Sequence, residues 1–185
     1  MFPQTSPRST VTYFTSTSTP SPEQNAQPRL FAEDPFRARF GADHRLPRGL
    51  REEARGMEWS LFAATYAPMP ELRISRLESA RMRGGEYRFT AELTRTSKTA
   101  QPHAETREIT AAGPVSACTH LLADAGRHVE ILSFHQSELY EATVTFLHVG
   151  HQTHHRRRAW AMGFGASPEA SAAAALSSGA QLIYG

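Results

Sequence analysis

The chain has little cysteine, little lysine and no long apolar run. Its only cysteine is Cys118, so an intramolecular disulfide and a zinc site built from several thiolates are both excluded, which favours the cytosol. Lysine occurs once, at Lys98, and the 20 basic residues nearly balance the 18 acidic ones, so the net charge of +2 implies no nucleic acid partner. No stretch approaches the roughly 18 to 20 apolar residues of a membrane-spanning helix, and the N-terminus lacks a compact apolar secretory signal. We therefore expect a cytoplasmic protein without membrane contact.

Composition divides the chain into three parts. Residues 1–34 are rich in Ser, Thr, Pro and Gln and have too few periodic apolar positions to offset the entropy of ordering, which predicts a disordered leader. A transit peptide is the alternative for its first 22 residues. Residues 35–70 hold two apolar islands around a charged stretch, typical of a short helical linker subdomain. Residues 71–185 then form the main domain.

The first half of the main domain predicts three strands and a helix. Apolar residues alternate with polar ones from Tyr87 to Leu93, as in a half-buried strand, and Gly84-Gly85 before it indicates a hairpin turn. A third strand is expected over about 103–110. A helix follows over about Pro114–Ala125, where apolar residues recur at helical spacing until Gly126.

The same order of elements then repeats after about fifty residues. HVEILSFHQSEL, YEATVTFLHV and HHRRRAWAMG predict three strands, and the Ala-rich stretch after them predicts a helix over about Pro168–Ser178. Such internal repetition predicts an α+β fold of two βββα units. In each unit the third strand is expected to end in a Gly-containing bend that opens a helix, at Gly113 and at Gly163 with Gly165. Unpaired N–H groups and the positive end of the helix dipole would suit a carboxylate there.

Three local features have a functional and a structural interpretation. The run HQTHHRRR at 151–158 could bind a metal ion or a phosphate, but a solvated hairpin tip is favoured, since adjacent histidines of a strand point to opposite faces. Cys118 could be a nucleophile with His120, but residues i and i+2 do not share a helix face, which favours core packing. The small residues of Ala170–Ala175 are explained either by high helix propensity or by a close approach of that helix to its neighbours, and the second is favoured.

Two stretches resemble the C-terminal regulatory domain of 2-isopropylmalate synthases. TAAGPVSACTHLLADAGRHVEILSFHQ is similar to the segment that builds half of the leucine-responsive domain, and AWAMGFGASPEASAAAALSSGAQ is similar to its second turn and final helix. LPRGLR and SLFAATYAP resemble the linker subdomain of those enzymes. The resemblance implies a domain that pairs with a second copy, or with a full-length synthase, and senses leucine or a related branched-chain amino acid.

The resemblance also implies an effector-binding site with four kinds of position. They are the first turn and helix start, apolar strand positions that line the pocket, a small position facing it, and the second turn. In that order these positions are Gly113, Pro114, Val115 and Ser116; Ile131 and Phe134; Ala142; and Gly163.

The chain departs from this family in ways that leave alternatives open. Ala111 stands where the family usually has Gly, and the loop between Leu139 and Glu141 is much shorter. A catalytic barrel needs roughly 250 residues, and nothing before residue 46 could supply one, so we expect a non-catalytic protein without cofactor or metal. The alternatives are a structural interaction domain that has lost effector binding, a truncated synthase remnant, and a weak nucleic-acid binder using Arg156 to Arg158.

Overall fold

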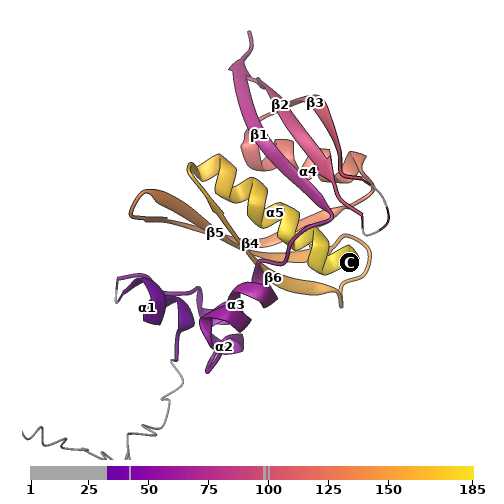
Figure 1. Ribbon diagram of the computed structural model, residues 1–185. Helices are drawn as coiled ribbons and strands as arrows, with labels where there is room; N and C mark the ends of the chain where they lie inside the picture. Colours follow the sequence, from indigo (N-terminus) through magenta and orange to yellow (C-terminus); the bar gives the residue numbers. More distant parts are fainter. Residues whose placement is uncertain (1–32, 42, 98, 100) are drawn as a thin grey trace, which may run out of the picture. The chain divides into compact units, whose positions relative to one another are not determined.

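The computed structural model describes residues 33–41, 43–97, 99 and 101–185 (Figure 1). The predicted leader therefore lies outside the described residues, apart from its last two. Asp34 belongs to the folded part, because its buried side chain caps the first helix. Its Oδ1 accepts hydrogen bonds from the N–H groups of Phe36 and Arg37, and its Oδ2 accepts one from Leu46, each at 3.0 Å.

Three short helices precede the sheets. They are α1 (Pro35–Phe40), α2 (Arg48–Glu53) and α3 (Trp59–Tyr66). Their buried side chains, among them Phe36, Leu50 and Phe62, form one hydrophobic cluster with Phe146 and Trp160 of the second sheet. Phe36 and Phe146 meet edge to face at a ring-centroid distance of 5.1 Å. The helices are therefore held to the second sheet by aromatic packing.

The rest of the described chain confirms the expected α+β fold of two βββα units. The first unit consists of β1 (Leu72–Arg81), β2 (Tyr87–Arg95), β3 (His103–Ala111) and α4 (Pro114–Asp124). The second consists of β4 (Val129–Leu139), β5 (Ala142–His151), β6 (Arg158–Gly165) and α5 (Pro168–Tyr184). Each sheet is antiparallel, with its strands in chain order. Gly84 and Gly85 have positive φ, as the predicted hairpin turn requires.

Two elements differ from the sequence-based expectation. The helix α5 runs past Ser178 to Tyr184, because Gly179 does not end it. A Cβ at Gly179 would lie only 3.1 Å from Val149, so this glycine lets the helix lie close to β5. The strand β6 begins at Arg158 instead of at the preceding histidines. His151 accepts hydrogen bonds from backbone N–H groups of the next residues, which makes 152–157 an exposed turn.

The helix α5 is the central element of the main domain. Its buried residues, mostly Ala, Ser and Gly, run from Ser171 to Ile183, and it packs against β6, β5, β1 and α4. Figure 1 shows it between the first unit and the sheet of the second. Two glycines of β6 permit the approach, because a Cβ at Gly163 would lie 2.1 Å from the backbone nitrogen of Ala175, and one at Gly165 would lie 2.3 Å from that of Ser171. The predicted close approach of this helix is confirmed.

Replacing Gly163 with alanine should lower the free energy of unfolding by about 1–3 kcal/mol or more, because the new methyl group collides with helix backbone that cannot move aside. Urea denaturation measures this change. Gly150→Ala is the matched control, since its Cβ would meet Leu132 at an ordinary 3.5 Å, and we expect a change below about 1 kcal/mol. A Gly163→Ala protein as stable as the parent would disprove the close approach.

Candidate functional site

A groove of about 610 Å³ lies between the two βββα units, and we call it the inter-unit groove. Its walls come from the segment after α3, from β1 and β2, from β6 and from α5. Its volume falls in the range of small-molecule sites, about 300–1,000 Å³. The lining residues used below are Met69, Arg73, Ser75, Arg76, Glu92, Thr94, Met162, Phe164 and Ser178.

One wall of the groove carries charges of both signs. Leu72 and Ile74 of β1 face the core, so alternation places Arg73 and Ser75 on the opposite face of the sheet, together with Glu92 of β2. Within the described residues the Arg73 guanidinium takes part in no ion pair. It is exposed and remains available to a carboxylate.

An irregularity in β1 places a second arginine beside Glu92. The register between β1 and β2 shifts between Ser75 and Glu78, and Arg76 inside this bulge has a φ of 48°. Bulges redirect a side chain, and here Arg76 Nη1 lies 3.3 Å from Glu92 Oε2. A positive φ at a residue other than Gly, Asn or Asp is uncommon and costs free energy. The bulge therefore places a second guanidinium beside Glu92 in the groove.

The groove is also lined by apolar side chains. Phe164 of β6 is 38% exposed, and Met69, in the segment after α3, is 89% exposed. Both line the groove with the buried Met162. The groove thus offers a guanidinium that has no ion pair among the described residues, a carboxylate and an apolar surface. These three features match the two charged ends of an amino acid and its aliphatic side chain.

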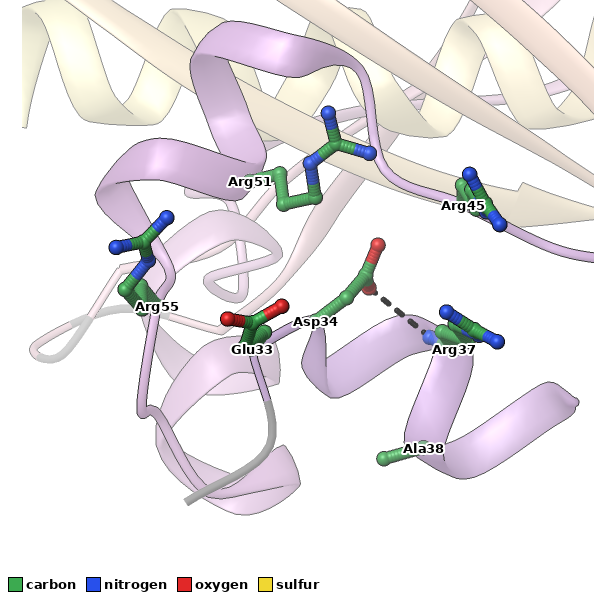
Figure 2. Close-up of a pocket in the computed structure, with 7 residues that line it drawn as sticks. All are labelled: Glu33, Asp34, Arg37, Ala38, Arg45, Arg51 and Arg55. Carbon is green, nitrogen blue, oxygen red and sulfur yellow. Dashed lines mark hydrogen bonds between the residues drawn. The ribbon is translucent and has the colours of Figure 1, made fainter. Parts of the chain in front are cut away.

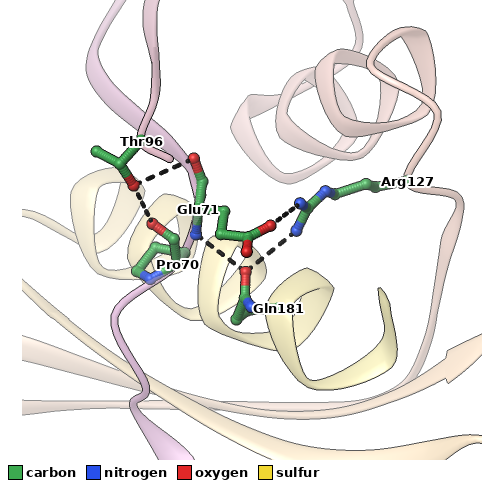
Figure 3. A network of polar contacts seen from close by, with 5 residues as sticks. All are labelled: Pro70, Glu71, Thr96, Arg127 and Gln181. Atoms are coloured by element: carbon green, nitrogen blue, oxygen red, sulfur yellow. Dashed lines mark hydrogen bonds and ion pairs between the residues drawn. The ribbon is translucent and has the colours of Figure 1, made fainter. Parts of the chain in front are cut away.

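A polar network at one end of the groove ties the two units together (Figure 3). Arg127, between α4 and β4, donates to Glu71 Oε2 at 3.0 Å and to Gln181 Oε1 of α5 at 3.2 Å. The same Gln181 oxygen accepts from the Glu71 N–H at 2.9 Å. The Arg127 side chain is 14% exposed, so solvent screens these contacts only in part. They fix the start of β1 against α5.

The residues predicted from the resemblance do not form one site. Gly113, Pro114, Val115 and Ser116 do begin α4, with Gly113 as its N-cap and no side-chain cap there. The φ of Gly113 is −173°, an extended conformation open to any residue, and a Cβ there would meet nothing within 4 Å. Glycine is therefore not required at this bend. Ala111 likewise has no positive φ, so its departure from the family pattern causes no strain.

The three predicted strand positions of β4 and β5 are divided between two faces of the sheet. Ile131 and Phe134 pair with Val149 and Leu147, which belong to the core cluster shared with α5. Ala142 is in phase with Val144, which belongs to the cluster shared with α1–α3. Ala142 therefore lies on the opposite face of the sheet from Ile131 and Phe134. Ile131 and Val115 do pack against the same core cluster.

Gly163, which the resemblance assigns to the second turn, lies two residues before the end of β6. It lies inside β6, paired with Thr145, and the strand continues to Gly165. The reason is the contact with α5, which needs a residue without a side chain in the strand itself. Gly163 nevertheless lines the inter-unit groove, so it is the one predicted site residue among those that form the groove.

Sequence analysis missed Arg73, Arg76 and Glu92. Alternation from Tyr87 to Leu93 marks Glu92 only as part of the solvent face of its strand, and no pattern singles out Arg73 or Arg76. The groove forms on that face because β6 and α5 lie beside β1. This packing brings together residues that are about ninety positions apart in the sequence. No short-range sequence pattern carries that information.

Cys118 and the histidine turn match their structural interpretations. Cys118 is 1% exposed in the core, and burial raises the pKa of its thiol to about 12, so at neutral pH it is not a thiolate nucleophile. Loss of solvent around its ring lowers the pKa of His151, helped by the neighbouring His154 and Arg157. In the described part of the chain, no three His, Cys, Asp or Glu side chains are placed to hold a metal ion.

A scan of the chain against protein-family models gives no match, and a search of curated proteins gives no significant match. Among the helices of the described residues, none combines the length and hydropathy needed to cross a bilayer. The resemblance to 2-isopropylmalate synthases therefore stays a prediction.

Proposed function

We propose that this chain is a non-catalytic regulatory and dimerisation domain, related to the C-terminal domain of 2-isopropylmalate synthases, that senses leucine or another branched-chain amino acid in the cytoplasm. Its partner is a second copy or a full-length synthase. The observation that carries the proposal is the inter-unit groove, which presents opposite charges and an apolar wall between two βββα units. The resemblance of the two stretches around Gly113 and Gly163 supports the same reading.

The chemistry of the groove favours an amino acid as the effector. Guanidinium groups bind carboxylates through paired N–H donors, so Arg73 takes the α-carboxylate. Glu92, held in place by Arg76, takes the α-ammonium group. Phe164 and Met69 then cover the aliphatic side chain and are themselves removed from water. This placement transfers the proposed effector from the start of α4 to the groove.

The position of the groove supports a sensing role. Its walls belong to both βββα units and to the segment that follows α3. A ligand in contact with all three stabilises one arrangement of the units, and a ligand shifts an equilibrium only through such differential contacts. The second candidate, a structural interaction domain without effector, is favoured by the two-residue turn Tyr140-Glu141, which replaces the longer loop of the family.

Leucine should bind the full chain and raise its thermal midpoint, with about 2.7 kcal/mol of added stability at a hundred times its dissociation constant. Arg73→Gln should weaken binding at least tenfold, about 1.4 kcal/mol, because one charge-assisted contact is lost. Calorimetric titration measures both affinities. Arg88→Gln, on the same strand pair but outside the groove, is the matched control and should bind like the parent.

Glycine, which has both charges but no side chain, should bind more weakly than leucine in the same titration. The absence of binding by every branched-chain amino acid would overturn the sensing function and favour the structural interaction domain. Equal losses in Arg73→Gln and Arg88→Gln would place the effector elsewhere.

Dimerisation is proposed to involve β4. This strand forms one edge of its sheet, and it exposes Leu132 by 36% and Phe134 by 41%. An edge strand with apolar side chains and unpaired backbone groups offers a template for a second strand. In a two-fold arrangement, β4 of the second copy covers these apolar side chains and pairs with these backbone groups.

Sedimentation equilibrium at micromolar concentration should therefore give twice the 20.5 kDa mass of one chain. Leu132→Lys should yield the monomer, because it places a charge in the paired edge. Leu61→Lys replaces another exposed leucine, on α3, and should leave the dimer intact. A monomeric parent, or a dimeric Leu132→Lys protein, would contradict pairing through β4.

A further inference from the structure

The helical part of the chain contains a second cavity, of about 540 Å³, that is lined by arginines (Figure 2). We call it the arginine pocket. Its lining residues come from α1 and the two residues before it, from the segment between α1 and α2, and from α2 and the turn that follows it. Its lining residues are Glu33, Asp34, Arg37, Ala38, Arg45, Arg51 and Arg55.

The two carboxylates do not neutralise the pocket. Both oxygens of Asp34 accept backbone N–H groups, from α1 and from Leu46, and the residue is 6% exposed. The carboxylate of Asp34 is therefore used to cap α1 and to hold Leu46. Within the described residues, the guanidinium groups of the four arginines form no ion pair with Glu33, with Asp34 or with any other side chain. Positive charge thus exceeds negative charge in the pocket.

Bringing four guanidinium groups to one cavity costs Coulomb repulsion, since an arginine cannot lose its charge in a protein. An arginine of the same segment that lies outside the pocket does have an ion-pair partner. Arg48 of α2, outside the pocket, pairs with Glu52 at 3.0 Å, four residues further along the helix. The arginines that line the pocket lack such a partner among the described residues. An anion from solution would offset the repulsion.

We propose that the arginine pocket binds a small molecule that carries a diphosphate group. A phosphoryl group accepts paired N–H donors from guanidinium groups, and the planar fork of arginine matches this geometry. The four arginines come from different segments and lie on more than one side of Asp34, as Figure 2 shows. Four forks provide more donors than one phosphoryl group can accept, which favours two linked phosphoryl groups. The site is separate from the inter-unit groove and does not depend on amino-acid sensing.

Calorimetric titration of the full chain with inorganic diphosphate, at constant ionic strength, tests the proposal. We expect saturable binding with at least tenfold higher affinity than for inorganic phosphate. The double variant Arg45→Gln/Arg51→Gln should lose at least tenfold in diphosphate affinity. Arg39→Gln, which removes an arginine of α1 that does not line the pocket, should retain the affinity of the parent.

Several results would overturn the proposal. They are the absence of saturable binding, equal losses in the double variant and in Arg39→Gln, and citrate binding as tightly as diphosphate, which would indicate attraction of any polyanion. If the double variant does not fold, Arg55→Gln replaces it, because Arg55 is exposed after the end of α2. In that variant an unchanged diphosphate affinity contradicts the proposal and a loss supports it. Leucine affinity should stay constant in all these variants.

Discussion

The contact between α5 and β6 is the constraint on which the rest of the structure depends. Glycines at 163 and 165 bring the backbone of the helix against the strand, where no side chain would fit. Small residues along α5 extend the same close packing to its other neighbours. The buried hydroxyl of Ser171, in α5, forms a hydrogen bond of 2.6 Å with the hydroxyl of Thr145, in β5. Because α5 contacts β1 and α4 as well as its own sheet, the two βββα units share one core.

The inter-unit groove is a consequence of that packing. With α5 close to β6, the outer face of β1 and β2 stands beside Phe164 instead of facing open solvent. Arg127 and Gln181 hold the start of β1 against the C-terminal part of α5. The arginine pocket has a different origin, since it depends on the short helices before the main domain.

Local patterns in the sequence were enough to predict the fold. Alternation in β2, the Gly84-Gly85 turn, the Pro-initiated helix and the recurrence of this order all operate over a few residues, and the structure confirms the two units that they indicate. The inter-unit groove could not be predicted from the sequence, because it depends on the packing of distant segments. Gly163 was interpreted as a turn residue, since a sequence does not distinguish a glycine needed for φ from one needed for space. The sequence does not give the pairing register that places Ala142 on the opposite face from Ile131 and Phe134, and Glu92 matches an ordinary solvent face.

The central claim is that the inter-unit groove is an effector site, and an NMR titration of the isotopically labelled chain with leucine tests it most directly. Backbone amide signals report the position of the ligand residue by residue, without any substitution. The account predicts saturable shifts concentrated at Arg73, Glu92, Phe164 and Ser178, which line the groove, and small shifts at Val115 and Ser116 of α4. Saturable shifts centred on the start of α4, or no shifts at saturating leucine, would contradict it.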